Sequence, residues 1–511
     1  MRSCVIFYLN GEKQVVDGEA ALQTVSDYLR YQQGLTGTKV VCAEGDCGAC
    51  TILVSRLERG NGNAQAATLG PYRTMNSCIA YVYSLHRSHV ITVEGLKATG
   101  NSQGSAGLHP VQKSMVEHQG SQCGFCTPGF VCSLAAMVED ARREGFSIDE
   151  KRVRNYTTGN LCRCTGYLPI LEAGTALDPA KTPALKTRFQ DDRIAQELGA
   201  IPEATLRLAS GSREVVLPLT LREALEEKSA DPALRLGAGT TDLGVVSNKG
   251  KLKLQRVLGL HQIEDLHLIR ETPEGYRIGA RATLHQAEAS LRKDFPEFSK
   301  LLRIFASPQI KNSATLVGNL MNASPIADTI PFLRVAGARV ILNSVRGERE
   351  VDVNDFILPG YKQLDLKPDE LVTGVFLPKS DHHFRLYKVS HRKDLDISAV
   401  TFAARYRIRT STGASGSIPV FESFSLALGG VGPSVLRLPS IEAQVKGQPV
   451  SLPSPGSLFS TLAQSMHQVL KPLTDVRGSA AYRHQLAENL LLRFFDETAQ
   501  EVGVSGWEAS V

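Results

Sequence analysis

The chain has 511 residues, too many for one ordinary hydrophobic core, and this length indicates roughly two to four domains. Its 42% hydrophobic and 21% charged residues are ordinary for a globular protein. The net charge is only +5 over the whole length, with no basic run or aromatic-basic stripe, so we expect no nucleic-acid partner.

The short apolar run at the N-terminus favours a cytoplasmic location. Its apolar run is too short for the core of a signal peptide, and Asn10-Gly11 ends it. No stretch of the chain is apolar for long enough to form a membrane helix, so we expect no membrane partner. In a reducing compartment the ten cysteines more often bind metal or do redox work than form disulfides.

Residues 1–96 predict a small β-grasp domain. Residues 5–16 read as a β-hairpin because two apolar runs flank Asn10-Gly11, a strong signal for a tight turn. A helical pattern over 22–33, a cysteine-rich loop and a strand at Thr51–Val54 follow in that order.

Residues 97–178 predict a helical domain, which begins with a Gly/Ser-rich connection over 97–107. Thr127 is expected to cap a helix whose first position is the following proline. Ser147 opens a capping-box pattern for the next helix. For His109-Pro110 a role at a helix entry is favoured over metal ligation.

The rest of the chain predicts further α+β structure. Three prolines and scattered charge indicate a linker over 179–203. Strand-like and helical runs alternate over 204–380, and 384–496 has long β-type runs followed by a helix. The expected fold class is therefore multidomain α+β.

The first cysteine set consists of Cys42, Cys47, Cys50 and Cys78. The first three have the spacing C-x4-C-x2-C, which is typical of a plant-type 2Fe-2S cluster with a distant fourth ligand. Small residues between them let the backbone wrap around an anionic cluster and donate amide hydrogen bonds to its sulfurs. A zinc site more often pairs two short cysteine hooks, so we favour 2Fe-2S.

The second cysteine set consists of Cys123, Cys126, Cys162 and Cys164, in the pattern C-x2-C followed by C-x-C. By spacing alone, zinc and 2Fe-2S are equally compatible with it. Its position directly after a plant-type loop favours 2Fe-2S.

Two segments around the second cysteine set resemble the molybdenum hydroxylases, the family of xanthine dehydrogenases, aldehyde oxidases and carbon monoxide dehydrogenases. They are GSQCGFCTPG at 120–129 and NLCRCTGY at 160–167, and both agree almost residue for residue. The resemblance implies 2Fe-2S clusters at all eight cysteines, a plant-type ferredoxin domain followed by a helical 2Fe-2S domain, and the second cluster nearest to molybdenum.

A glycine-rich turn at 236–243 is a weak phosphate-binding signal by itself, and it matches neither a Walker loop nor a Rossmann fingerprint. Downstream, FASPQIKNSATLVGN at 305–319, ASPIAD at 323–328, YKVS at 387–390 and DIS at 396–398 resemble the FAD domain of the same family, of the PCMH type. The resemblance implies that FAD is held by Leu236, Gly237, Ala238, Gly239, Thr240, Thr241, Asp242, Leu243, Phe305, Thr315, Val317, Gly318, Asn319, Asp328 and Ile397.

Within that set the resemblance implies distinct roles. The 236–243 and 315–319 segments would hold the diphosphate, Asp328 would bind the adenosine side, and Phe305 and Ile397 would lie near the flavin ring. The family usually has glycine where this chain has Val317. Because a β-branched residue does not easily take positive φ, we expect weaker or shifted FAD binding.

The domain order resembles the small subunit of two-subunit bacterial xanthine dehydrogenases, and segments at 429–433 and 475–483 resemble the family's last flavoprotein domain. The resemblance implies electron transfer from a separate molybdopterin-binding large subunit, which hydroxylates hypoxanthine and xanthine to urate. Electrons would pass through the second cysteine set, the first set and FAD to NAD+, in an assembly with two copies of each subunit. The residues themselves show no catalytic triad or carboxylate pair, so no catalytic residue is assigned.

Two alternatives remain open. The same electron chain could serve a partner that oxidises aldehydes or another N-heterocycle. The chain could instead be a non-enzymatic zinc-binding scaffold with a degenerate flavin fold.

Overall fold

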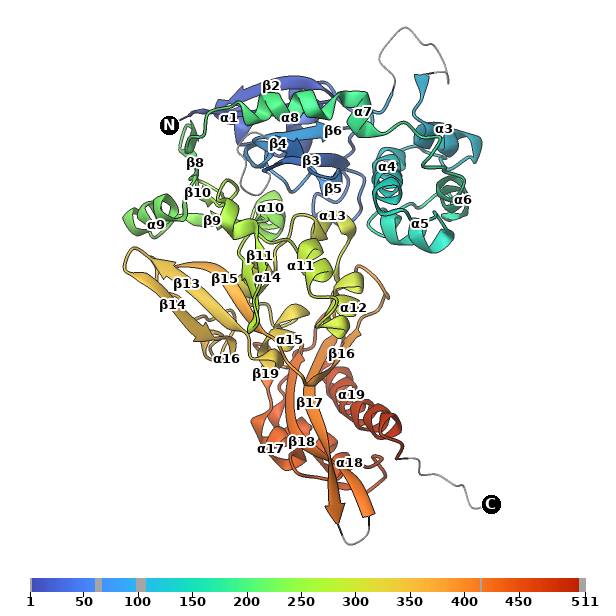
Figure 1. The fold of residues 1–511 in the computed structure, drawn as a ribbon, viewed down its shortest axis with the longest axis vertical. Helices are drawn as coiled ribbons and strands as arrows, with labels where there is room; N and C mark the ends of the chain where they lie inside the picture. Colours follow the sequence, from blue (N-terminus) through green and yellow to red (C-terminus); the bar gives the residue numbers. More distant parts are fainter. Residues whose placement is uncertain (1, 60–66, 98–106, 414–415, 505–511) are drawn as a thin grey trace. The chain divides into compact units, whose positions relative to one another are not determined.

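The computed structural model describes residues 2–59, 67–97, 107–413 and 416–504. The chain divides into two compact units, each described by itself: Met1–Glu264 with Ala306–Ala314, and Asp265–Phe305 with Thr315–Val511 (Figure 1). Most of the expected connection at 97–107 lies outside the described residues. No helix in the described ranges is both long enough and apolar enough to span a bilayer.

A six-stranded sheet opens the first unit, with strand order β2-β1-β6-β3-β4 and β5 beside β3. The predicted hairpin is confirmed: β1 and β2 pair antiparallel around Asn10 (φ 52°) and Gly11 (φ 90°), the two left-handed positions that a tight hairpin turn needs. The predicted helix at 22–33 is found as α2 and the π-helix η1. The elements are β1 Cys4–Leu9, β2 Glu12–Asp17, α1 Gly18–Ala21, α2 Val25–Asp27, η1 Tyr28–Gln32, β3 Thr51–Arg59, β4 Ala67–Leu69, β5 Arg73–Asn76, η2 Val82–Leu85 and β6 Ser88–Ile91.

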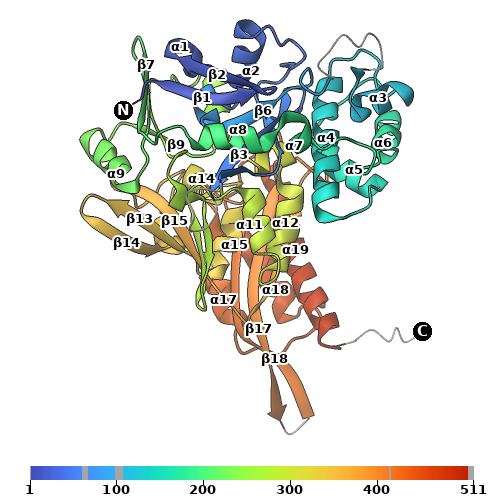
Figure 2. The same ribbon diagram turned by 45° about the horizontal axis from the view of Figure 1, so that its top comes forward.

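Four helices form the next part of the first unit and gather beside one another in both views (Figures 1 and 2). His109 is confirmed at a helix entry, because its Nδ1 accepts a hydrogen bond from Val111 N at 3.3 Å and caps α3. Burial lowers the pKa of His109 to about 4, which keeps the ring neutral for that role. The helices are α3 Pro110–Glu117, α4 Thr127–Glu144, α5 Glu150–Thr157 and α6 Leu168–Thr175.

Two predicted helix caps are wrong. Cys126 is the N-cap of α4, and the Thr127 hydroxyl donates to Ser121 Oγ at 2.8 Å instead. Asp149, not Ser147, caps α5 by accepting from Arg152 N at 2.7 Å. A carboxylate satisfies the helix start and also complements its dipole, which favours the aspartate over the serine.

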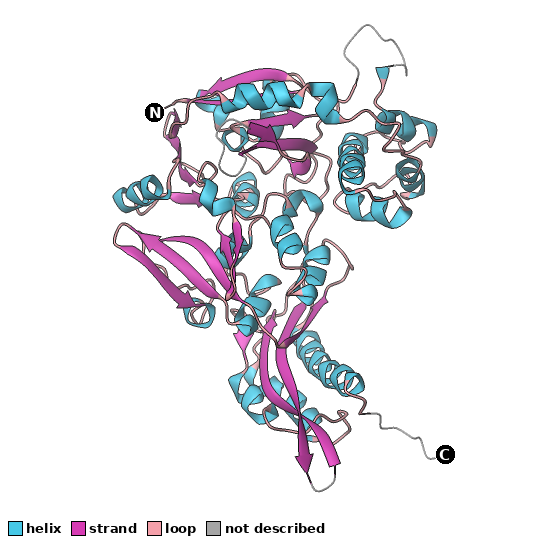
Figure 3. Ribbon diagram, viewed as in Figure 1, coloured by secondary structure: helices cyan, strands magenta, loops and turns pink. Residues whose placement is uncertain are grey.

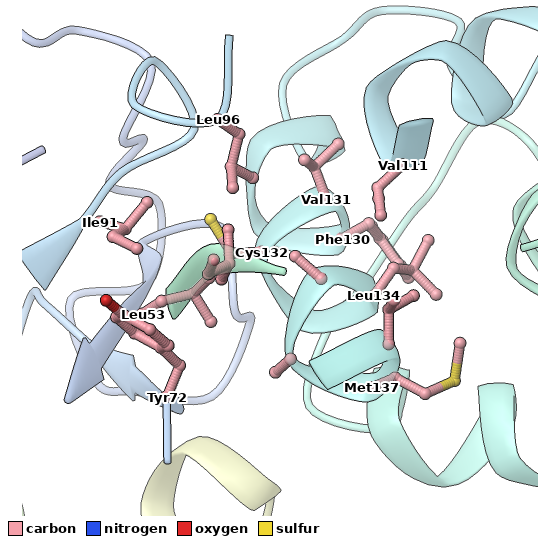
Figure 4. Packing of buried hydrophobic residues seen from close by; sticks show 14 of the residues in the cluster. Leu53, Tyr72, Ile91, Leu96, Val111, Phe130, Val131, Cys132, Leu134 and Met137 are labelled. Carbon is pink, nitrogen blue, oxygen red and sulfur yellow. The ribbon is translucent and has the colours of Figure 1, made fainter. Parts of the chain in front are cut away.

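The segment 179–203, predicted as a linker, forms two helices, α7 Leu185–Phe189 and α8 Asp191–Gly199. Ile194 and Leu198 on α8 are fully buried in an apolar cluster that also contains β-grasp and α4 side chains. Figure 4 shows this cluster, with Leu53 and Tyr72 on one side and α4 on the other. The helical spacing of apolar residues therefore decides the structure of the segment 179–203, although prolines near its ends favoured a linker.

A buried polar contact anchors α8. Tyr72 Oη donates to Asp191 Oδ1 at 2.7 Å and lies 2.7 Å from Nδ1 of the fully buried His89. We expect Tyr72→Phe to lower the free energy of unfolding by about 1–3 kcal/mol, because it leaves the buried Asp191 carboxylate short of a donor. Urea unfolding followed by circular dichroism measures this, with the exposed Tyr31→Phe as control; equal midpoints for the two variants would contradict it.

The predicted alternation of strands and helices over 204–380 is found, but its strands divide between the two units. The first unit holds a four-stranded sheet of order β7-β8-β10-β9, and the second a five-stranded sheet of order β11-β12-β15-β13-β14. The elements are β7 Leu206–Ser210, β8 Arg213–Leu217, α9 Leu221–Ala230, β9 Arg235–Gly237, α10 Thr241–Asn248, β10 Arg256–Gly259, η4 Glu264–His267, β11 Ile269–Glu271, β12 Gly275–Gly279, α11 Leu284–Ser290, α12 Pro296–Phe305, α13 Pro308–Lys311, α14 Leu316–Asn322, α15 Thr329–Ala336, β13 Arg339–Ser344, β14 Gly347–Asp352, α16 Val353–Phe356 and β15 Leu371–Pro378.

The second unit ends in a four-stranded antiparallel sheet of order β16-β17-β18-β19, packed against α17, α18 and α19 (Figure 3). The predicted strands and the closing helix are confirmed, and α19 buries Leu491, Phe494 and Phe495 in the core of this part. The elements are β16 His383–Val389, β17 Val400–Gly413, β18 Gly416–Gly429, β19 Leu436–Arg437, α17 Pro439–Val445, α18 Leu458–Val469 and α19 Ala480–Glu501. The fold class is multidomain α+β, as predicted.

Candidate metal centres and flavin site

The first cysteine set comes together in the first unit. Cys42 and Cys47 lie in the loop before β3, Cys50 directly precedes β3, and Cys78 follows β5. Cys42 Sγ accepts a hydrogen bond from Cys47 N at 3.4 Å, and Ser77 N, beside Cys78, donates to Cys50 O at 3.3 Å. Local hydrogen bonds thus join Cys42 to Cys47 and the Cys50 peptide to the residue before Cys78.

Interactions between the first-set thiols shift their pKa values in opposite directions. Hydrogen bonds from Cys47 and Cys78 lower the pKa of Cys42, and one from Cys78 lowers the pKa of Cys50. The same contacts raise the pKa of Cys47 and of Cys78. Metal binding needs deprotonated cysteines, so it would release protons from these thiols.

The loop around this set is shaped for sulfur ligation. Cys42 Sγ accepts hydrogen bonds from Glu44 N and Cys47 N, both at 3.4 Å. Gly45 and Gly48 have φ values of 75° and 69°, the left-handed region that favours glycine. Backbone amides aimed at a cysteine sulfur are what an anionic cluster needs, so the residues present fit it.

The second cysteine set forms a separate group. Cys123 and Cys126 precede α4, while Cys162 and Cys164 lie between α5 and α6. Cys164 Sγ lies 3.5 Å from Cys123 Sγ, so the C-x2-C and C-x-C segments meet. Burial raises the pKa of Cys126 to about 12, whereas Cys123 and Cys164 are exposed. This set reaches the surface of the first unit, unlike the buried Cys50 and Cys78 of the first set.

Among the described residues, no three His, Cys, Asp or Glu side chains group as ligands of one metal ion. The preference for a 2Fe-2S cluster over zinc therefore rests on the cysteine spacing and on the backbone around the first set.

The predicted flavin residues 236–243 lie in the first unit, where β9 ends at Gly237 and α10 begins at Thr241. A Cβ on Gly239 would lie 2.2 Å from Ser313 O, so only glycine fits there. A small cavity of about 10 Å³ is lined by this turn, by α13 and by residues beside Cys78: Asn76, Ile79, Ala80, Gly239, Thr241, Gln309, Ile310 and Ser313. It is about the size of one water molecule and far smaller than a typical cofactor pocket of ~300–1,000 Å³.

The remaining predicted flavin residues lie in the second unit. Thr315 caps α14 by accepting from Gly318 N at 2.9 Å, and Asn319 Oδ1 accepts from Thr329 Oγ1 at 2.6 Å. Val317 is buried inside the regular helix α14 and has no positive φ. The positive φ considered for Val317 is therefore wrong, because the helix gives valine an ordinary conformation, and weaker or shifted FAD binding stays a prediction.

Asp328 forms a buried ion pair within the second unit. Its Oδ2 accepts from Lys388 Nζ at 2.8 Å and its Oδ1 from Ser398 Oγ at 2.6 Å. The side chains of Lys388 and Asp328 are 1% and 5% exposed. Burial raises the pKa of Asp328, and the Lys388 charge opposes that rise. Its role toward adenosine stays a prediction.

Phe305 is the last residue of α12 and is half-buried, while Ile397 is 45% exposed in the loop after β16. Sequence reasoning gave no role to Lys388, Asn160 or Gln309, all of them hydrogen-bonded inside the units. The segment YKVS at 387–390, which resembles the family's FAD domain, was the available signal for Lys388.

Four family models match consecutive parts of the chain. They are described as a 2Fe-2S iron-sulfur cluster binding domain (residues 7–83), a 2Fe-2S binding domain (92–175), an FAD binding domain in molybdopterin dehydrogenase (210–380) and a CO dehydrogenase flavoprotein C-terminal domain (385–498). Both cysteine sets fall within the two iron-sulfur matches.

Curated relatives match over almost the whole chain. Xanthine dehydrogenase of Drosophila subobscura is 30% identical over 99% of the chain and 40% of its own length. Xanthine dehydrogenase of Oryza sativa subsp. japonica is 29% identical over 98% of the chain and 40% of its own length. The chain thus spans about 40% of the length of these relatives.

Solved structures share the fold of part of the chain. Quinoline 2-oxidoreductase from Pseudomonas putida 86 has a TM-score of 0.50 at 23% identity, covering 56% of this chain and 96% of the matched one. Carbon monoxide dehydrogenase from Hydrogenophaga pseudoflava has a TM-score of 0.50 at 20% identity, covering 55% and 96%. At these identities the likeness concerns the fold alone.

Proposed function

Because the chain belongs to the molybdenum hydroxylase family and carries its two 2Fe-2S domains and its FAD-binding domain, we propose that it is the electron-transfer subunit of a xanthine dehydrogenase. Electrons from purine hydroxylation on a molybdopterin-binding large subunit would pass through both clusters and FAD to NAD+. The complex would be cytoplasmic, with two copies of each subunit.

The observation that carries this proposal is the direct contact between the two cysteine loops. Leu161, the residue before Cys162, donates its backbone N–H to Cys47 O at 2.9 Å. One hydrogen bond thus links the peptide of a first-set cysteine to the residue beside a second-set cysteine. Two redox centres held in these sets would be joined within a single compact unit.

The exposure of the two sets supports the order of transfer. Cys123 and Cys164 are exposed, so the second set can be approached by a donor on another chain. Cys50 and Cys78 of the first set are buried, and residues next to Cys78 line the same pocket as the predicted flavin turn. When bound, the clusters supply one-electron transfer and FAD joins it to the two-electron reduction of NAD+.

Co-purification of the full chain with its large subunit tests this function. We expect iron, acid-labile sulfide and FAD in the complex, and xanthine-dependent reduction of NAD+. An aldehyde or another N-heterocycle reducing NAD+ in place of xanthine would overturn the substrate, while leaving the electron-transfer role. A colourless protein with zinc at the cysteines would overturn both.

A further inference from the structure

A buried glutamine contacts the loops of both cysteine sets. Gln309, on α13, is 1% exposed and belongs to the first unit. Its Nε2 lies 3.1 Å from Thr51 Oγ1 and 3.1 Å from Asn160 Oδ1. Thr51 directly follows Cys50, and Asn160 lies two residues before Cys162. One side-chain amide therefore spans the first and second sets.

The acceptors around this amide are arranged to receive its two N–H groups. The Thr51 hydroxyl donates its own proton to Gly48 O at 2.6 Å, so its oxygen remains an acceptor. The Ser133 hydroxyl, 3.4 Å from Gln309 Nε2, donates to Asn160 Oδ1 at 2.7 Å. Asn160 Nδ2 in turn donates to Gly48 O at 3.1 Å, which closes a ring of hydrogen bonds between the loops.

The loops pack so closely that side chains are excluded between them. A Cβ on Gly48 would lie 2.1 Å from Gly159 O, and one on Gly129 would lie 2.2 Å from Gly48 O. A Cβ on Gly159 would lie 2.0 Å from Gln309 Oε1. Because backbone contacts backbone here, a change in the Gln309 side chain is expected to shift the loops that carry Cys47 and Cys162.

We propose that Gln309 is a positioning residue whose amide holds the two cysteine loops at the separation that sets the coupling between their clusters. It acts through Thr51 and Asn160 and contacts no cysteine sulfur itself. This inference rests on the proposed function, because it requires a cluster in each set.

The test is Gln309→Met in the full chain, followed by electron paramagnetic resonance of the fully reduced protein. Methionine keeps the length of the side chain but has no N–H, so Thr51 and Asn160 lose their shared donor. We expect an unchanged iron and sulfide content, and a reduced magnetic splitting between the two reduced clusters, because the remaining backbone contacts hold the loops together less tightly. A merely structural role of Gln309 would leave that splitting in place.

Two further variants sharpen the test. Asn312→Leu removes another side-chain anchor of the same segment, the bonds from Asn312 Nδ2 to Thr74 O (3.0 Å) and Oγ1 (3.2 Å), and should keep the splitting. Ser133→Ala removes one member of the ring while retaining a good helix former, and should weaken the splitting. If Gln309→Met does not take up iron, the splitting of Ser133→Ala tests the proposal in its place.

Cluster-loaded Gln309→Met or Ser133→Ala with the unsubstituted splitting would overturn the inference, as would an equal loss in Asn312→Leu. Failure of the proposed function is distinguishable from these results. In that case the unsubstituted chain itself would hold no iron and give no pair of cluster signals.

Discussion

Lys388→Met is expected to destabilise the second unit by about 3–5 kcal/mol, because it leaves the buried Asp328 carboxylate without its countercharge. Urea unfolding followed by circular dichroism measures the loss. Lys379→Met, which removes a partly exposed lysine paired with Glu271 in the same unit, is the matched control and should change little. Equal midpoints for the two variants would contradict the expected effect.

The same variant should acquire a characteristic pH dependence. Burial already raises the pKa of Asp328, and removing the opposing Lys388 charge raises it further. The folded variant then holds a proton that the unfolded chain releases above about pH 4. Its stability should therefore fall as pH rises from about 4 through the raised pKa of the folded state. The double variant Lys388→Met/Asp328→Asn should abolish this slope and recover most of the stability.

Gly48→Ala is expected to prevent assembly of the first cluster. The added Cβ would lie 2.1 Å from Gly159 O and 2.6 Å from Asn160 Nδ2, so the two cysteine loops would be forced apart. Iron per chain should fall to about half, since each set is expected to hold one cluster of the same size. Iron and acid-labile sulfide analysis after reconstitution measures this.

Gly145→Ala separates crowding from backbone strain. Gly145 has φ 72°, close to the 69° of Gly48, but nothing lies within 4 Å of its Cβ position. Both variants carry the same left-handed penalty of about 1–2 kcal/mol, so only the crowding differs. Full iron content in Gly48→Ala, or an equal loss in Gly145→Ala, would show that close packing of the loops is not what the cluster requires.

Features set by neighbouring residues could be predicted from the sequence. The hairpin needed only Asn10-Gly11 between apolar runs, and its register follows from that turn. The two cysteine sets were readable because ligand spacing is a local property of a loop. Long-range contacts decided the rest: the helix α8 is stabilised by burial of Ile194 and Leu198 in a cluster of distant residues.

In the candidate site, too, local features could be predicted from the sequence and long-range contacts could not. Val317 was judged by the glycine usual at its position, but α14 gives it a helical conformation that the pattern alone does not reveal. Gln309 lies 149 residues from Asn160 and 258 from Thr51 along the chain. No pattern within a sequence window reports contacts of that kind, so the network could be found only once the fold was known.

The membership of Ala306–Ala314 in the first unit bears on how the protein matures on the ribosome. Residues up to Glu264 are translated first, yet the core they build lacks Gln309 until the later segment emerges. Until then Thr51 and Asn160 have no shared donor, and the two cysteine loops have fewer restraints than in the finished chain. A fragment truncated at Glu264 would remain permanently at that stage, with an unfilled polar gap between its loops.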